Sequence, residues 1–166
     1  TKHGVIEEYN ACREKAVLID LSSLRKFEII GPDAEELMNY TLTRNIKKLS
    51  VGQVIYSAMC YENGTMFDDG TLLRLSETGF RWICGDEYAG EWLKEVAQKK
   101  KFKVNIKNST DQISNVSIQG PKSREILKKM MDFDHQCCYF SAKTPFSGRA
   151  AANFLKTNRH IDEKVL

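Results

Sequence analysis

Two adjacent carboxylates, Asp68 and Asp69, stand within ENGTMFDDGTLLRL, residues 62–75. They lie between a turn signal at Asn63-Gly64 and a run of apolar residues that is typical of a strand. Aspartate is depleted in strands because its short side chain competes for backbone hydrogen bonds, so a pair at a strand start calls for a reason. A carboxylate beside a ligand cleft can accept a hydrogen bond from an amine and stabilise positive charge on nitrogen. The alternative is a solvated turn.

Other chemistry finds little support in the residue types and their spacing. The five cysteines are odd in number and lack CxxC spacing, so neither a zinc site nor a disulfide framework is indicated. Cys60 and Cys84 lie in apolar runs and are expected in the core, while Cys137-Cys138 is the single candidate for redox chemistry. The three histidines are scattered, and the GxSxG, HExxH, Walker A and GxGxxG patterns are missing. We expect no metal site.

The composition is that of a chain with a sizeable core. It has 166 residues, 42% of them hydrophobic, and a net charge of +3, which favours one compact domain or two small ones. Five lysines cluster at Lys99, Lys100, Lys101, Lys103 and Lys107. Lysines that alternate along an edge strand form a solvated face that resists aggregation, so we expect no nucleic-acid partner.

The residue pattern predicts a mixed succession of helices and strands. Helical spacing is found at residues 4–16, with a stripe of Val5, Tyr9, Cys12 and Ala16, and again at 33–45, at 87–100 and from 121 onwards. Strands are expected at residues 24–30, 53–61, 71–75, 79–85, 102–107 and 113–119. Residues 137–140 are a further strand candidate, and residues 150–155 are expected to form a short helix.

This order predicts an α+β fold. A strand, a helix, several strands, a helix and a last strand match a ferredoxin-like antiparallel sheet with helices on one face. In the strand at 24–30, Phe27 and Ile29 alternate with Lys26 and Glu28, so the two apolar and the two charged side chains are expected on opposite faces. The same alternation predicts that Asp68 and Asp69 point to opposite faces.

Three segments in this order resemble a known family: IDLSSLRKFEIIGPDAEEL, LTRNIKKLSVGQVIYSAMCYENGTMFDDGTLLRL and NVSIQGPKSREIL. They are similar to the aminomethyltransferase T-protein of the glycine cleavage system and its folate-binding relatives, over residues 5–131. The resemblance implies three lobes around a folate channel, with a ferredoxin-like middle lobe. We therefore expect a first lobe that starts in 1–23, a middle lobe at 24–110, a return to the first lobe at 111–140 and a divergent tail at 141–166.

The resemblance also implies site residues. Asp69 matches the family's catalytic aspartate, which lies near the folate nitrogens that accept the one-carbon unit, and Tyr56 matches a tyrosine that lines the folate site. Ile83 is expected beside them as a cofactor-binding residue. The implied cofactor is tetrahydrofolate, and the implied reaction transfers a one-carbon unit to it from an aminomethyl or N-methyl donor. This hypothesis requires Asp69 to lie at the rim of a cavity large enough for a pteridine.

Several departures from the family pattern limit these expectations. The family's DVSHMG segment is DLSSLR here, at residues 20–25, and ICGDEYAGEW replaces an Asn-containing segment that helps to bind folate. The family regions that follow QGPK, including the carboxylate that recognises the pterin, are missing. The chain is thus expected to be a divergent, partial member. The alternative is a non-catalytic folate-binding-like or protein-interaction domain that self-associates.

The sequence also leads to expectations about partners and location. A lipoyl-carrier protein or another amine donor is the implied partner, and a homo-oligomer would bury the apolar surface that the missing lobes leave exposed. No run approaches the 18 apolar residues of a membrane span, and the first residues do not form a signal peptide, so we expect a cytoplasmic protein without membrane contact.

Overall fold

The computed structural model describes residues 4–130 and 152–155 of the chain. These residues form four α-helices, eight strands and two short 3₁₀ helices in a mixed order. The helical elements are α1 (Val5–Glu14), α2 (Ala34–Thr41), η1 (Ile46–Lys48), α3 (Tyr88–Lys100), η2 (Thr110–Gln112) and α4 (Ser123–Met130). The strands are β1 (Val17–Asp20), β2 (Arg25–Ile30), β3 (Val54–Cys60), β4 (Met66–Ser76), β5 (Gly79–Cys84), β6 (Asn105–Asn108), β7 (Asn115–Gln119) and β8 (Ala152–Leu155).

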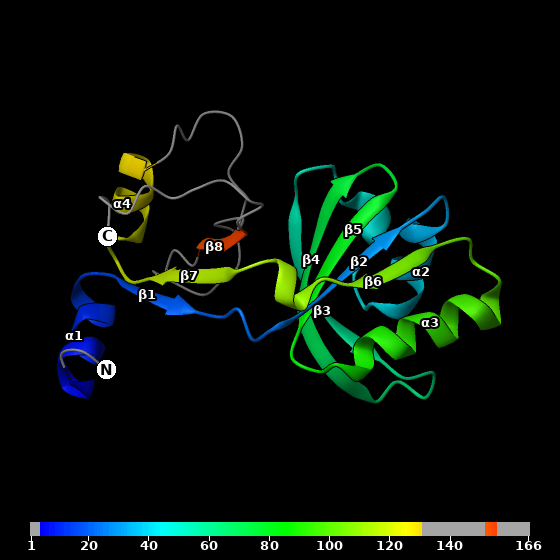
Figure 1. Ribbon diagram of the computed structural model, residues 1–166, viewed down its shortest axis with the longest axis horizontal. Coiled ribbons are helices and arrows are strands. Elements are labelled where there is room, and N and C mark those ends of the chain that lie inside the picture. The colour runs from blue at the N-terminus through cyan, green and yellow to red at the C-terminus, as the bar shows by residue number, and fades with distance from the viewer. Residues whose placement is uncertain (1–3, 131–151, 156–166) are drawn as a thin grey trace.

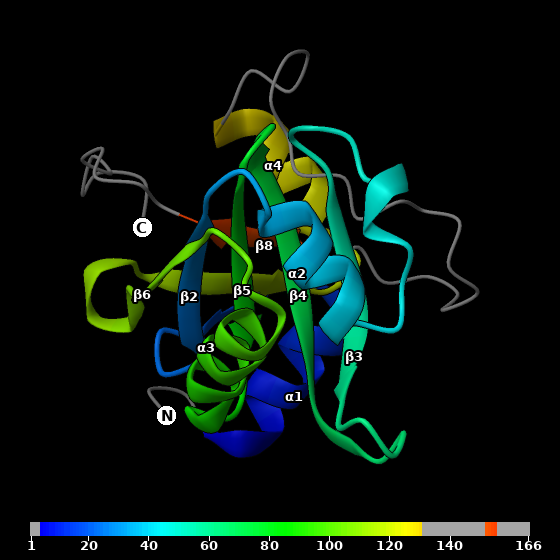
Figure 2. The ribbon, with the colours of Figure 1, turned by 90° about the vertical axis from the view of Figure 1, so that its right-hand side faces the viewer.

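A five-stranded sheet forms the centre of the larger lobe. Its strand order is β3-β4-β5-β2-β6, and every neighbouring pair is antiparallel. Both α2 and α3 lie across one face, whereas β7, β8, α1 and α4 lie behind the other face (Figure 2). The predicted α+β fold, with an antiparallel ferredoxin-like sheet and helices on one face, is confirmed. Strand β6, which follows most of the lysine cluster and contains Lys107, is an edge strand, as expected.

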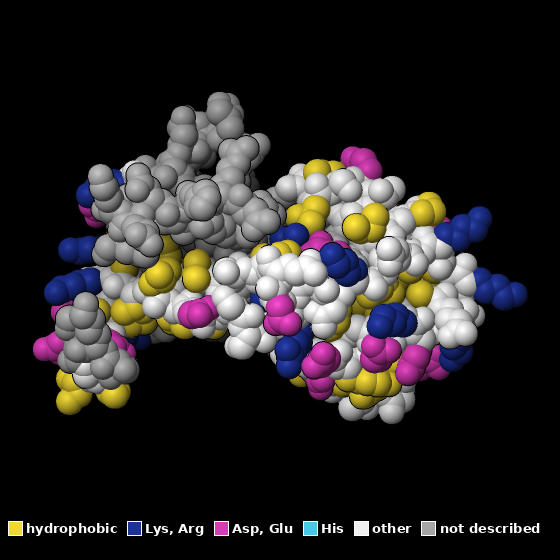
Figure 3. Space-filling model, in the orientation of Figure 1, with side chains coloured by type: hydrophobic (Ala, Val, Ile, Leu, Met, Phe, Trp, Pro, Cys, Tyr) yellow, Lys and Arg dark blue, Asp and Glu magenta, His cyan; other side chains and the backbone are white. Residues whose placement is uncertain are grey.

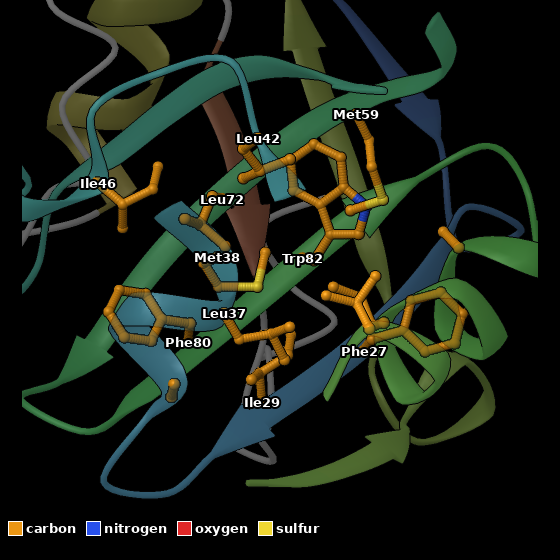
Figure 4. Close-up of a cluster of buried hydrophobic side chains, with 14 of the residues drawn as sticks. Phe27, Ile29, Leu37, Met38, Leu42, Ile46, Met59, Leu72, Phe80 and Trp82 are labelled. Carbon is orange, nitrogen blue, oxygen red and sulfur yellow. The ribbon is translucent and has the colours of Figure 1, made fainter. Parts of the chain in front are cut away.

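The core lies between this sheet and the two helices (Figure 4). Alternate strand residues point into it, because successive side chains of a strand face opposite sides of the sheet. Trp82 and Phe80 of β5 are fully buried there, and Leu37 and Met38 of α2 cover them from the helix layer. Trp92 of α3 packs against the same cluster.

A second sheet joins segments from both ends of the chain, with the order β1-β7-β8 and antiparallel pairing (Figure 1). Strand β1 was not expected, and the short helix predicted at residues 150–155 was wrong, because β8 occupies that segment. Both segments pair with β7, from which they are distant in sequence. Such long-range partners override the local preference of a short segment. The strand candidate at 137–140 and Cys137-Cys138 lie outside the described residues.

Helix α1 differs from the prediction in its packing. It has no buried residue, and the side chains of Val5, Ile6 and Tyr9 are 75%, 76% and 62% exposed. Apolar side chains are also visible along the neighbouring surface of the smaller lobe, where Leu18 of β1 is 53% exposed (Figure 3). The predicted helix is thus present, but the described residues leave the start of its apolar stripe exposed and cover Cys12 and Ala16 only in part.

No helix in the described part of the chain combines the length and apolar character needed to cross a membrane.

Candidate functional site

Strand β4 carries the aspartate pair within the sheet. The strand begins at Met66, before the predicted start at residue 71, so both carboxylates lie inside it. Asp68 is opposite Met59 and Asp69 is opposite Ala58 on β3, and the register slips directly after Met59. Because the two aspartates are neighbours in a strand, their side chains point to opposite faces, as the alternation predicted.

Asp69 lies on the sheet face opposite to α2 and α3, which we call the open face. The hydroxyl of Tyr56, on the neighbouring strand β3, donates a hydrogen bond to Oδ2 of Asp69. This bond is the main reason why the pKa of Tyr56 is raised above its ordinary value. Oδ1 of Asp69 has no hydrogen-bond partner among residues 4–130, and the side chain is exposed. The carboxylate is thus oriented by Tyr56 and still has one oxygen with which to accept a proton donor.

Small and apolar side chains surround this pair on the open face. Tyr56 is opposite Thr71 of β4, and Thr71 is opposite Ile83 of β5, so these three residues form one row across the sheet. Ile83 is 4% exposed and thus contributes mainly a covered apolar floor. Gly70 allows β4 and β5 to approach closely, since a Cβ atom there would lie 2.1 Å from the carbonyl oxygen of Ile83.

Asp68 lies on the sheet face that α2 and α3 cover, and its carboxylate accepts two backbone N–H groups. Its Oδ1 accepts a hydrogen bond from the backbone N–H of Asp69 at 2.8 Å, and its Oδ2 accepts one from the N–H of Asp86 at 3.0 Å. Asp86 in turn accepts the N–H of Tyr88 at the start of α3, at 2.8 Å. Asp68 therefore links the strand that carries Asp69 to the loop between β5 and α3.

Two further side chains that could do chemistry, Arg74 and Cys84, take no part in the contact between Tyr56 and Asp69. Arg74, in the same strand, is ion-paired with Glu35 at 2.6 Å and Glu77 at 3.2 Å. Burial raises the pKa of the Cys84 thiol, so this cysteine is an inert core residue. No cluster of three or more potential metal ligands occurs within the described ranges.

A hollow of about 480 Å³ lies between α3 and β6. Its wall contains Phe102, Val104 and Ile106, but none of Tyr56, Asp69 and Ile83. The hollow is thus separate from the open face, and the expected cavity beside Asp69 stays a prediction.

Lys26 is the residue of this face that sequence reasoning missed. The alternation placed it opposite to the apolar residues of its strand but gave no sign that it is fully buried, in a row across the sheet that includes Ile83. A charged residue that alternates with apolar ones gives no sequence signal for burial, because that pattern is normally the exposed side of a strand. Glu28 and Arg81, also on this face, form an ion pair at 2.5 Å.

Comparison with known proteins supports the family resemblance. The family model described as the GCVT N-terminal domain matches residues 1–156. A trimethylamine-oxide aldolase of Ruegeria pomeroyi is 57% identical over 128 residues, which are 77% of this chain and 16% of that protein. An aminomethyltransferase of Alkaliphilus metalliredigens is 34% identical over 134 residues, which are 79% of this chain and 36% of the relative.

A solved structure agrees with these matches. The glycine cleavage system aminomethyltransferase T of Bartonella henselae superimposes with a TM-score of 0.68 at 27% identity, over 76% of this chain and 35% of that chain. The chain thus spans about a third of the length of the aminomethyltransferases and a smaller part of the aldolase. The family model covers more than half of the chain, and the fold agrees with that of a solved relative. The chain therefore belongs to the GCVT N-terminal domain family.

Proposed function

We propose that this chain forms one wall of a site for one-carbon transfer to tetrahydrofolate, with Asp69 as its catalytic carboxylate. The observation that carries the proposal is the exposed Asp69 carboxylate, which is oriented by Tyr56 and whose Oδ1 has no hydrogen-bond partner among the described residues. Tetrahydrofolate, when bound, supplies the nitrogen that accepts the one-carbon unit. Asp69 would accept a hydrogen bond from an amine at this place and stabilise the positive charge that develops there.

The residues around Asp69 fit such a ligand. A flat heterocycle needs an accessible floor with few bulky side chains, and the small, half-buried side chains of Ala58 and Thr71 lie next to the carboxylate, with the covered Ile83 beside Thr71. A phenol and a carboxylate offer the polar contacts that fix the orientation of a ligand in a mostly apolar site. Within this proposal Tyr56 keeps the carboxylate in place, and Ile83 contributes apolar contact.

The donor is proposed from the relatives. The protein that is 57% identical is named for trimethylamine oxide, whereas the aminomethyltransferases are 34% and 36% identical. A methylated amine is therefore our first choice of donor. A lipoyl-carrier protein, the partner expected from the resemblance, is the second choice.

Binding of tetrahydrofolate tests the proposal. Titration under anaerobic, reducing conditions, followed by heat flow, should give saturable binding for the native chain. Asp69→Asn keeps the shape but removes the charge, so we expect a loss of about tenfold or more, the usual effect of one hydrogen bond to a charged group. Glu91→Gln, an exposed carboxylate of α3 on the opposite side, is the matched control. Equal affinity of Asp69→Asn and the native chain would refute the role of Asp69.

The exposed apolar residues of α1 and β1 favour a second candidate, a non-catalytic domain that associates with itself or with another protein. This candidate predicts no binding of tetrahydrofolate together with a mass that rises with protein concentration. The titration and a sedimentation measurement on the same sample therefore separate the two functions.

A further inference from the structure

Lys26 is a buried cation whose role the core does not explain. Its side chain is 0% exposed and is one of the largest fully buried side chains of the described residues. The Nζ atom donates to the backbone oxygens of Ser22 at 2.9 Å and Leu24 at 2.8 Å. An ammonium group has three N–H donors, so one donor has no acceptor among the residues that the structure describes.

Arg81, the neighbouring cation on the same face, differs from Lys26 because it has a carboxylate partner. Arg81 is also buried, but its Nε atom donates to the carboxylate of Glu28, which accepts a further bond from Ser109 at 2.9 Å. Lys26 has no carboxylate oxygen within 4.0 Å in the part of the chain that the structure describes. A buried charge without an ion pair is costly to keep, and an anion bound beside it would lower that cost.

The electrostatic surroundings of Lys26 agree with this reading. Burial lowers the pKa of Lys26, the carboxylates of Asp111 and Asp20 act in the opposite direction, and the nearby charges of Arg81 and Arg25 add to the lowering. The two aspartates therefore act at a distance and do not replace a direct partner. An anionic ligand would remove part of the cost of burial.

The sheet places Lys26 beside the candidate site. Lys26 is opposite Ile83, Ile83 is opposite Thr71, and Thr71 is opposite Tyr56, so one row joins them across four strands. The ammonium bends toward Leu24. That end of β2 is also the end of the sheet where Asp69 lies, since Arg25 is opposite Cys84 and Cys84 is opposite Gly70. Two strand spacings between β2 and β4 correspond to about 10 Å.

We propose that Lys26 is the anion-binding group of the same site, and that its third N–H binds a carboxylate of the ligand whose amine lies at Asp69. The ligand class is thus an amine that carries a carboxylate about 10 Å away, as two strand spacings require. This inference rests on the proposed function, because it assumes that Asp69 receives the amine. It adds a specificity: ligands without the carboxylate bind weakly.

Lysine side-chain NMR tests the contact directly. The chain is labelled with [ε-¹³C]lysine, and the Lys26 signal is assigned by its loss in Lys26→Arg, which keeps the charge. The probe is p-aminobenzoyl-glutamate, which has the carboxylates but no pterin, and the neutral control compound is p-aminobenzamide. We expect the Lys26 signal to shift with the first probe only, while the signal of Lys107, an exposed lysine on the same face, stays constant. No shift, or equal shifts with both compounds, would overturn the proposal.

Affinity for tetrahydrofolate is the second measurement. Lys26→Met should weaken binding about tenfold or more, as expected for the loss of a charge-assisted hydrogen bond, whereas Lys26→Arg and Lys107→Met should bind nearly as the native chain does. A thermal unfolding transition, measured for each variant, serves as the control that the variant is folded. Unchanged affinity of a folded Lys26→Met would contradict the proposal.

The two proposals fail in different ways. If the native chain does not bind tetrahydrofolate but p-aminobenzoyl-glutamate shifts the Lys26 signal, the proposed function fails and the anion site stands. If tetrahydrofolate binds and its affinity depends on Asp69, but the Lys26 signal does not shift with p-aminobenzoyl-glutamate, the anion-binding role of Lys26 is refuted and the proposed function stands.

Discussion

Neighbouring residues of one strand have different tasks in this protein. Asp69 presents a carboxylate on the open face, and Asp68 accepts two backbone N–H groups on the other side. The sequence predicted that the two side chains point to opposite faces, because alternation in a strand is a local property, but it did not predict the hydrogen bonds of Asp68. It did not predict the burial of Lys26, since the cover of that side chain depends on the β1–β2 connection and on segments distant in sequence.

Removal of the Asp68 carboxylate should destabilise the fold. Asp68→Ala leaves the N–H groups of Asp69 and Asp86 without their acceptor, and we expect the free energy of unfolding to fall by about 1–3 kcal/mol. Urea unfolding measures this change. Asp69→Ala is the control, because its exposed carboxylate receives only the hydroxyl of Tyr56, and its effect should be smaller. A larger loss in the control would mean that Asp69 is the structural residue.

The titration of Tyr56 should report on its bond to Asp69. The phenol donates to a carboxylate, which favours the neutral form and raises the pKa of Tyr56 above 10.0. The difference in absorbance at alkaline pH between the native chain and Tyr56→Phe isolates this group. In Asp69→Asn we expect the pKa of Tyr56 to fall. Because the folded pKa lies above the unfolded one, the bond stabilises the fold below pH 10 and this contribution is lost as the pH rises through the folded pKa.

At the scale of the elements, local signals were sufficient for the larger sheet but not for the smaller one. The predicted segments at 24–30, 79–85 and 87–100 correspond closely to β2, β5 and α3, in which apolar periodicity and turn residues agree. Strand β1 has four residues and was not expected, and β8 lies in a segment that was expected to form a short helix. Both depend on β7 for their hydrogen bonds, and a pattern read along the chain does not contain that pairing.

The packing of α3 on β2 gives a prediction at this scale. Gly90 lies against the ring of Phe27, and a Cβ atom at Gly90 would be 2.3 Å from Cε1 of that ring. Alanine is better than glycine in a helix by about 1 kcal/mol, but overpacking of a core costs about 1–3 kcal/mol. We therefore expect Gly90→Ala to lower the melting temperature. Gln98→Ala, at an exposed position of the same helix, should leave it nearly unchanged, and stabilisation by Gly90→Ala would show that the ring can move aside.

At the scale of the whole molecule, the chain contains one well-packed sheet and a smaller lobe with apolar surface. The division into segments 1–23, 24–110, 111–140 and 141–166 stays a prediction, as does the location of the protein. The strands of the larger sheet all come from residues 25–108, whereas the smaller sheet joins residues 17–20 with residues 115–119 and 152–155. Residue patterns could indicate the family and the site strand, but they could not show which surfaces stay uncovered.

That apolar surface leads to a prediction about association. Ile6 on α1 and Leu18 on β1 are 76% and 53% exposed, and contiguous apolar surface of this kind favours contact with another molecule. We expect the native chain to show a mass that rises with concentration in analytical ultracentrifugation. Ile6→Glu and Leu18→Glu should shift it toward the monomer, because a charge would then be buried in the contact. Val51→Glu, at a position 47% exposed in the loop before β3, should not. A native chain that is monomeric at every concentration would mean that this surface does not bind a second copy.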